Sequence, residues 1–248
     1  MSEPRRLTLL KLGPDAGPEA ALAAAAAYDE LEAAFAGSVR SSARSGRGRL
    51  VVVGGGIVGL MSAYFASVRG YRVRLVERLS PGGAASGRNG GGVLVLGHTL
   101  DDVPFNRLSL RLWAELARAG VASELTVSGH VMLAFSEQEA ETLRGAGELY
   151  LAAGLPVEWL DSSEVRRLLP HVTAEQRGGL RCPVDAQAYP FRAVSSLLSR
   201  LRDGGAELIT HTRVTGFRVE GSRVRAVITE AGDVEADAVL LCAGPWSA

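Results

Sequence analysis

Three glycines with the spacing G-x-G-x-x-G are the residues whose pattern points most directly to chemistry. Gly54, Gly56 and Gly59 follow a short apolar run and precede a segment that is typical of a helix. In this pattern the first glycine permits a tight turn, the second lets the backbone approach a diphosphate, and the third lets the helix pack close to a sheet. The N–H groups at the start of such a helix attract phosphate. Glu77 stands 77 − 59 = 18 residues beyond the last glycine, where it can accept hydrogen bonds from an adenosine ribose.

The elements that must position these residues follow at β-α-β spacing. Residues 50–53 form a fully apolar run that predicts a buried parallel strand. Residues 60–69 favour a helix that Gly70 can end, and residues 71–77 alternate like a second strand. The pattern predicts a mononucleotide-binding unit with Glu77 at the carboxyl end of its second strand.

A second stretch of small residues, Ser86-Gly87-Arg88-Asn89-Gly90-Gly91-Gly92, follows this unit. An acid at position 77 would repel the 2′-phosphate of NADP, so NAD and FAD are the candidate cofactors. An enzyme that uses nicotinamide would normally continue with further β-α units. A loop of small residues instead lets backbone N–H groups approach phosphate or the edge of a flat ring. By itself, the stretch is equally compatible with a surface loop.

Composition excludes several other classes of protein. The 248 residues are 47% apolar and 22% charged, which is typical of a soluble globular protein. Lys plus Arg equals Asp plus Glu at 27 each, so nucleic acid is not expected as the main partner. No apolar run reaches the roughly 20 residues of a membrane-spanning helix. The only lysine is Lys11, which argues against a P-loop ATPase and against pyridoxal chemistry.

The cysteines and histidines do not form a recognisable metal site. Cys182 and Cys242 lie sixty positions apart, which leaves no C-x-x-C motif, and the four histidines are scattered. We therefore expect two buried, reduced cysteines, a cytoplasmic location and no bound metal.

Four motifs in order resemble the FAD-dependent D-amino-acid oxidase and sarcosine oxidase superfamily, also called the DAO family. They cover residues 51–77, Ala85 to Gly92, Asp185-x-Gln187-x-Tyr189-Pro190, and Cys242 to Ser247. The S-G-R-N-G-G-G form is most similar to the β-type flavin subunits of amine, opine and hydroxyproline dehydrogenases. Ala186 departs from the family pattern, which usually has glycine after the aspartate.

The resemblance implies an α/β fold, with a Rossmann-like FAD-binding domain and an interleaved α+β substrate domain. The expected division is residues 1–48 as an appended helix and flexible linker, 49–128 and 183–248 as the two parts of the FAD-binding domain, and 129–182 as a substrate-domain segment.

The resemblance also implies which residues hold FAD. The three glycines would contact the diphosphate, Glu77 the adenosine ribose, and the backbone of Val214 the adenine. The remaining residues of the implied cofactor set are Arg78, Ser86, Arg88, Asn89, Gly90, Gly91, Ala243 and Gly244. Those from Ser86 to Gly91 would follow the ribityl chain toward the isoalloxazine edge, and Ala243 and Gly244 would close over the diphosphate.

The chemistry implied is oxidation of a C–N bond in an amino acid or secondary amine, by hydride transfer to flavin N5. No catalytic residue is assigned. His98, Arg107 and Arg111 could face a substrate, but solvated side chains are the simpler expectation. Gly244 to Ser247 has the form of a helix start with Ser247 as the N-cap.

We expect the C-terminal half of the fold to be absent from this chain. We therefore expect the chain alone to be inactive and to need a partner subunit or the missing half. Two alternatives stay open at this point: an NAD-dependent dehydrogenase, and a non-catalytic nucleotide-binding subunit.

Overall fold

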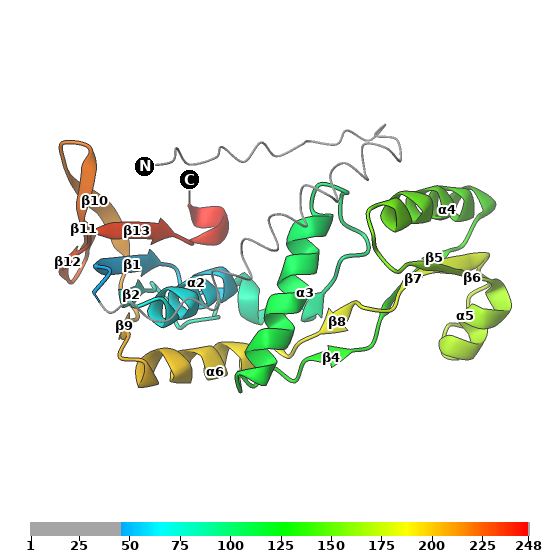
Figure 1. Ribbon diagram of the computed structural model, residues 1–248, viewed down its shortest axis with the longest axis horizontal. Coiled ribbons are helices and arrows are strands. Elements are labelled where there is room, and N and C mark those ends of the chain that lie inside the picture. The colour runs from blue at the N-terminus through cyan, green and yellow to red at the C-terminus, as the bar shows by residue number, and fades with distance from the viewer. Residues whose placement is uncertain (1–45, 248) are drawn as a thin grey trace. The chain divides into compact units, whose positions relative to one another are not determined.

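The computed structural model describes residues 46–247 of the chain. The helix and linker expected in residues 1–48 lie outside the described residues except for positions 46–48. Within the described part, the chain divides into two compact units, and each is considered by itself (Figure 1). Unit 2 holds residues 46–91, 115–125 and 188–247, and unit 1 holds residues 92–114 and 126–187.

Unit 2 is built on a four-stranded parallel sheet with the order β13-β1-β2-β9. Its strands are β1 (Arg49–Val53), β2 (Arg72–Val76), β9 (Glu207–Ile209) and β13 (Ala238–Leu241). Val51 and Val52 are fully buried, since successive residues of β1 point to opposite, covered faces. This sheet and its first β-α-β unit confirm the α/β fold class expected from the sequence.

Two helices and a small sheet cover the faces of the parallel sheet. The helices α2 (Ile57–Val68) and α6 (Pro190–Asp203) pack together, and Leu60 and Leu197 join Val52 in one core cluster. On the other face, Val51 packs in a cluster with Val227. The small antiparallel sheet there consists of β10 (Val214–Glu220), β11 (Arg223–Thr229) and β12 (Gly232–Glu235). Unit 2 is completed by the short 3-10 helices η1 (Ala85–Gly87) and η2 (Gly244–Trp246).

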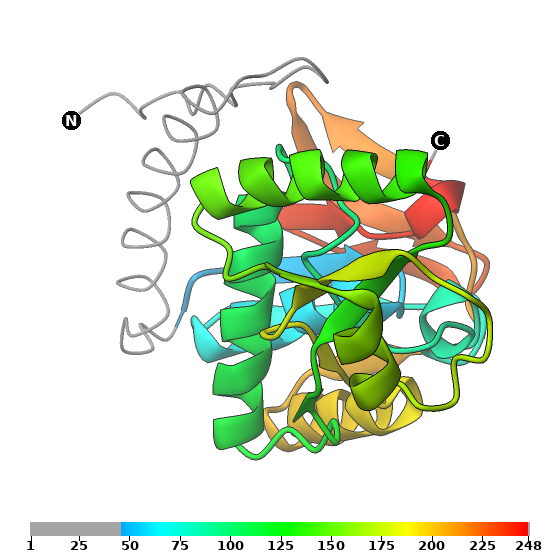
Figure 2. The ribbon, with the colours of Figure 1, turned by 90° about the vertical axis from the view of Figure 1, so that its right-hand side faces the viewer.

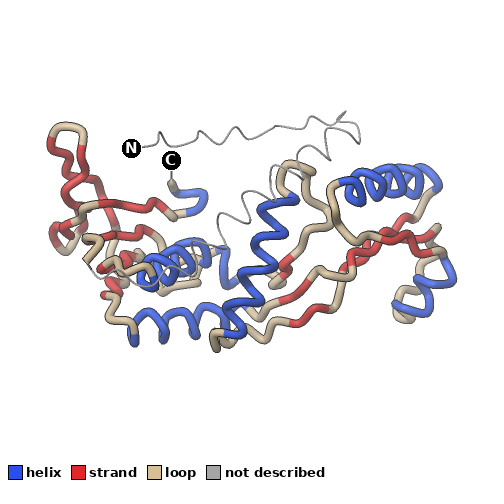
Figure 3. The backbone as a smooth tube through the Cα atoms, viewed as in Figure 1, coloured by secondary structure: helices blue, strands red, loops and turns tan. Residues whose placement is uncertain are grey.

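Unit 1 mixes helices with short antiparallel strands (Figure 3). One sheet has the order β5-β7-β6 and another the order β3-β8-β4. The strands are β3 (Gly92–Val93), β4 (Thr126–Val127), β5 (His130–Ala134), β6 (Glu158–Leu160), β7 (Gly178–Cys182) and β8 (Ala186–Gln187). The helices are α4 (Glu137–Ala152) and α5 (Ser162–Leu168), whereas α3 (Val103–Arg118) belongs to both units. The domain boundaries expected from the sequence stay a prediction.

The starts of α4 and α5 agree with their sequence signals. Ser136 and Glu139 form a capping box at the start of α4, in which the Ser136 hydroxyl accepts the N–H of Glu139 at 3.2 Å. Asp161 caps α5 and accepts N–H groups of Ser163 and Glu164 at 2.7 and 2.8 Å. Both helices appear at the front of Figure 2. Local hydrogen-bonding signals therefore fix these two helix starts.

Some strands were not expected, and one expected cap is wrong. The central strand β7 begins with Gly178 and Gly179, which the sequence pattern does not distinguish from a loop. A Cβ atom at Gly178 would clash with the Trp159 ring, so glycine is what lets β7 pair beside β6. Ser247 was expected to be an N-cap, but it follows η2 with helical backbone angles and is its C-cap.

No helix among residues 46–247 combines the length and the hydropathy that crossing a bilayer would require.

Candidate cofactor-binding site

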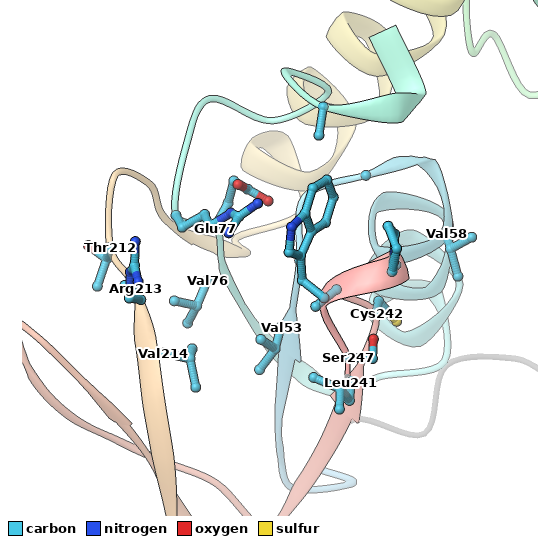
Figure 4. A pocket seen from close by; sticks show the side chains of 18 of the residues that line it. Val53, Val58, Val76, Glu77, Thr212, Arg213, Val214, Leu241, Cys242 and Ser247 are labelled. Atoms are coloured by element: carbon cyan, nitrogen blue, oxygen red, sulfur yellow. The ribbon is translucent and has the colours of Figure 1, made fainter. Parts of the chain in front are cut away.

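A hollow of about 810 Å³ lies in unit 2 where β1, β2 and β13 end (Figure 4). Ligand pockets in proteins commonly measure about 300 to 1,000 Å³. The carboxyl ends of parallel strands are also where open α/β sheets bind their ligands. Of the residues expected to hold the cofactor, the following line this hollow: Gly54, Gly56, Glu77, Arg78, Ser86, Val214, Ala243 and Gly244.

Gly54 forms the turn that leads out of β1. Its φ angle is +112°, in a region that side chains disfavour. A Cβ atom there would clash with the carbonyl oxygen of Cys242. The N–H of Gly54 donates to the carbonyl of Val76 at 2.8 Å, and the N–H of Cys242 donates to the carbonyl of Val53 at 2.7 Å. The turn is therefore fixed between the neighbouring strands β2 and β13.

Gly59 and Gly56 shape the start of α2. A Cβ atom at Gly59 would clash with the carbonyl oxygen of Gly54, so the helix can lie this close to the turn only with glycine there. Gly56 is the N-cap, with extended backbone angles and no side-chain cap. The Ser86 hydroxyl accepts the N–H of Ile57 at 2.9 Å. The helix N-terminus borders the hollow and presents its partial positive charge there.

Glu77 connects the segment that follows β2 to the glycine-bearing turn that follows β1. One carboxylate oxygen, Oε2, accepts the N–H of Gly55 at 2.6 Å, and Oε1 accepts the N–H of Leu79 at 2.7 Å. An ionised carboxylate has about four lone-pair positions, so acceptor capacity remains after these two bonds. The side chain is partly exposed and lines the hollow. Glu77 is thus placed to accept further hydrogen bonds from a diol.

The second glycine-rich stretch is held by its own side chains. The Asn89 amide donates to the carbonyls of Ala85 and Ser86 at 3.1 and 2.9 Å, and its oxygen accepts the N–H of Gly91 at 2.8 Å. Gly91 has a φ of +75° and leaves no space for a Cβ atom beside the carbonyl of Ala188. Among the expected cofactor residues, Gly59, Arg88, Asn89, Gly90 and Gly91 do not line the hollow.

The sequence reasoning missed several residues that line the hollow. Thr212 and Arg213 follow β9, and the N–H of Thr212 donates to the carbonyl of Glu77 at 3.0 Å. Trp246 lies in η2, and its indole is in contact with the guanidinium of Arg78. Thr212 and Arg213 could have been suspected from their place just after a strand of the parallel sheet.

Cys182 and Cys242 are both free thiols. Burial, together with the nearby carboxylate of Asp185, raises the pKa of Cys182 to about 11. Burial also raises the pKa of Cys242, which lines the hollow. Neither thiol is therefore activated as a nucleophile. Within the part of the chain that the structure describes, no group of three or more His, Cys, Asp or Glu residues could hold a metal ion.

Asp185 of the third motif has a structural position in unit 1. Its carboxylate is fully buried and accepts the N–H groups of Val95 and Leu96 at 2.7 and 3.2 Å. The motif is therefore more than a turn before a helix, because Asp185 fixes the chain that follows β3. His98, Arg107 and Arg111 are not among the residues that line the hollow of unit 2.

The lining of the hollow suits an adenine dinucleotide in its chemistry. A helix N-terminus and the backbone of Gly54 and Gly56 line the hollow at the end of β1, and a carboxylate suited to ribose hydroxyls lies at the end of β2. The apolar side chains of Val53 and Val76 also line the hollow, below Glu77 in the view of Figure 4.

Comparisons with known proteins agree with this geometry. Residues 49–248 match the family described as FAD dependent oxidoreductase, DAO. The chain is 27% identical over 243 residues to hydrogen cyanide synthase subunit HcnC of Pseudomonas aeruginosa, covering 80% of this chain and 58% of that protein. It is 28% identical over 208 residues to glycine oxidase of Geobacillus kaustophilus, covering 80% and 55%.

The solved structure of glycine oxidase from Geobacillus kaustophilus is similar, with a TM-score of 0.75 at 26% identity. The similarity covers 81% of this chain and 56% of that one. The chain thus spans a little over half the length of the relatives it matches. Between the two cofactors left open by the sequence, the family match selects FAD over NAD.

Proposed function

Because the chain belongs to the DAO family of FAD-dependent oxidoreductases, we propose that the hollow at the end of β1 binds FAD. We further propose that the whole protein oxidises a C–N bond of an amino acid or secondary amine. The observation that supports the binding site most directly is the hydrogen bond between Glu77 and the N–H of Gly55, which joins the ribose-binding acid to the glycine turn.

Each part of the dinucleotide has residues that would hold it. Gly54, Gly56 and Gly59 shape the start of α2, which holds the diphosphate, and Glu77 accepts the ribose hydroxyls. The backbone of Val214 holds the adenine. Ala243 and Gly244 approach the diphosphate from the end of β13, and Arg78 supplies a positive charge beside it.

The second glycine-rich stretch leads toward the flavin end in this proposal. Ser86 lines the hollow, and Arg88, Asn89, Gly90 and Gly91 follow it. The internal hydrogen bonds of Asn89 keep this stretch in one shape, so its backbone can meet a ring edge without first being ordered.

When bound, FAD would supply the acceptor for the hydride that leaves the α-carbon of the amine. The residues of this chain fix the cofactor's position, and the apolar lining around Val53, Val76 and Val214 excludes water from its adenosine part. No side chain of the described residues is assigned a proton-transfer step.

The substrate class is proposed from the similar proteins. One of them is a glycine oxidase and another is a subunit of hydrogen cyanide synthase. A small amino acid or secondary amine is therefore the substrate class to test first. A partner subunit is part of the proposal, since one similar protein carries the word subunit in its name.

Cofactor titration of the purified chain tests the binding site. We expect FAD to bind, with its fluorescence and visible absorbance changed, and NADH not to bind. Glu77→Gln should weaken FAD binding about tenfold or more, because a carboxylate that accepts from hydroxyls and N–H groups is replaced by an amide.

Glu207→Gln is the matched control. Glu207 lies on β9, where it pairs with Arg74 at 2.7 Å, and it does not line the hollow. A chain that melts cooperatively but binds neither FAD nor ADP would overturn the binding site. Equal FAD affinity of Glu77→Gln and Glu207→Gln would overturn the role of Glu77. Turnover of a panel of primary and secondary amino acids with an artificial electron acceptor tests the proposed reaction.

A further inference from the structure

Arg78 and Trp246 form a contact between two separate segments of unit 2. Arg78 follows β2 directly after Glu77, whereas Trp246 lies in η2 after β13. The guanidinium carbon of Arg78 lies 4.4 Å from the centroid of the Trp246 ring. Cation–π contacts are effective within about 6 Å, so the two side chains attract one another. Neither residue was paired with the other by the sequence motifs.

The order of strands places this contact across the end of β1. In the parallel sheet, β1 lies between β13 and β2. A contact that joins the segment after β2 to the segment after β13 therefore crosses the position of Gly54 and Gly56, where α2 begins. Both Arg78 and Trp246 line the same hollow as these glycines. The side-chain pair consequently spans the place that the proposed function gives to the diphosphate.

Arg78 has two competing kinds of partner at this position. Within residues 46–247 its guanidinium forms no ion pair with a carboxylate, and its contact is the face of the indole. A guanidinium binds a phosphate group through two parallel hydrogen bonds, which are stronger than an exposed cation–π contact. A diphosphate entering the hollow would therefore draw Arg78 away from the ring.

Trp246 is free to move when that contact opens. Its side chain is 53% exposed, and η2 is a single turn of three residues. Gly244, at the start of η2, has a φ of +59° and open space around it. The backbone near Trp246 can therefore rotate without disturbing the core of unit 2.

We propose that Arg78 and Trp246 form a latch across the diphosphate site. The latch opens to admit an adenine dinucleotide, and Trp246 then closes over the bound diphosphate and slows its release. This inference rests on the proposed function, because it takes the diphosphate of FAD as the ligand. It adds Trp246 to the cofactor-binding residues and predicts a kinetic role for it.

Stopped-flow binding of ADP and FAD to the full chain tests the latch. We expect Trp246→Leu to raise the association rate about threefold to tenfold, because the closed contact no longer has to open. The dissociation rate should rise by a similar or larger factor. If Trp246 only added contact area, its replacement by leucine would raise the dissociation rate and leave the association rate unchanged. The association rate is therefore the decisive measurement.

A second cation–π pair in the chain provides the matched control. Arg144 lies 4.4 Å from the centroid of the Trp159 ring, within unit 1 and outside the hollow. Arg144→Gln should leave both rate constants for ADP unchanged, and adenosine, which lacks the diphosphate, should associate equally fast with the wild-type chain and with Arg78→Gln. For ADP, Arg78→Gln should lower the affinity because the charge partner is lost.

Tryptophan fluorescence gives a readout that does not depend on activity. In a variant with Trp113→Phe and Trp159→Phe, Trp246 is the only tryptophan. ADP should change its emission, and adenosine, which lacks the diphosphate, should change it less. If this variant does not fold, the difference between the wild-type chain and Trp246→Phe gives the same signal.

The outcomes separate the latch from the binding site. Binding of ADP with an association rate that Trp246→Leu leaves within twofold of the wild-type value would overturn the latch alone. Absence of any ADP or FAD binding to a folded wild-type chain would overturn both the latch and the proposed function.

Discussion

The carboxylate of Glu77 holds the backbone N–H of Gly55 at 2.6 Å, so the acid that ends β2 also fixes the turn that ends β1. Its other oxygen holds the N–H of Leu79 at 2.7 Å. The spacing of Glu77 from the glycines suggests only a contact with a ligand, but its carboxylate also binds two backbone N–H groups of the protein itself. Substitutions in this hollow will therefore change stability as well as ligand affinity, and the two must be measured separately.

Gly59→Ala should strongly destabilise unit 2. The added methyl group would clash with the carbonyl oxygen of Gly54, which belongs to the backbone and has little freedom to move. We expect a loss of about 2 to 4 kcal/mol in the free energy of unfolding, the range of overpacked core positions and strained turns. Urea denaturation followed by circular dichroism measures it.

Gly145→Ala is the control for this substitution. Gly145 lies inside α4, and nothing lies within 4 Å of the position where its Cβ atom would be. The same chemical change should stabilise the chain there by about 0.5 to 1 kcal/mol. Equal effects of the two variants would contradict the close packing of α2 against Gly54.

Asp185→Ala should destabilise unit 1 more than Asp185→Asn. The fully buried carboxylate accepts the N–H groups of Val95 and Leu96, and alanine leaves both donors without a partner. Each unsatisfied buried group costs about 1 to 3 kcal/mol. Asparagine retains one acceptor oxygen, so the urea midpoint of Asp185→Asn should lie between those of the wild-type chain and Asp185→Ala. An alanine variant as stable as the wild-type chain would show that water replaces the carboxylate.

The pair of Asp237 and Arg49 should make stability depend on pH in the acid range. Hydrogen bonds from the Arg49 side chain and backbone lower the pKa of Asp237 to about 2. A lowered pKa in the folded state gives stability that is present above the unfolded pKa near 4 and is lost as the pH falls toward 2. Asp237→Asn should therefore be less stable than the wild-type chain at pH 6 and equally stable near pH 2. Thermal melts of both proteins at the two pH values measure this difference. An equal difference in melting temperature at both pH values would contradict the prediction.

Cys182 should react slowly with alkylating reagents in the folded chain. Its pKa, raised to about 11, lies about two units above the ordinary value, which lowers the thiolate fraction at pH 8 by about a hundredfold. Cys242, half-buried at the hollow, should react faster than Cys182. Peptide mapping after timed iodoacetamide treatment compares the two residues. Equal rates in the folded chain and in 8 M urea would contradict the burial of Cys182.

Local patterns predicted much of the framework of unit 2. The glycine spacing, the apolar run before Gly54 and the acid at position 77 each specify backbone geometry or polarity within a few residues, and the structure brings them to one hollow. The capping boxes of α4 and α5 are local in the same sense. Such signals are readable because each donor and its acceptor lie close together in the chain.

Contacts between distant segments were not predictable in this way. Trp159 and Leu160 of β6 pass beside Gly178, and Val131 and Met132 of β5 pass beside Gly179, and no local rule reveals these neighbours of β7. Likewise, Thr212 and Trp246 line the hollow because β9 and β13, which precede them, lie in the same sheet as β1 and β2. The family resemblance supplied the position of Val214, but it did not indicate that Arg78 and Trp246 would meet.

The place of β13 beside β1 also determines when the hollow can form during protein synthesis. Leu50 pairs with Ala238, 238 − 50 = 188 residues later, so the turn at Gly54 obtains one of its two neighbouring strands only after that further length of chain has been synthesised. At roughly 5 to 20 residues per second, the first glycine-rich segment waits about 10 to 40 seconds for that partner. A dinucleotide that needs the turn at Gly54 in its final form can therefore bind only after β13 has joined the sheet beside β1.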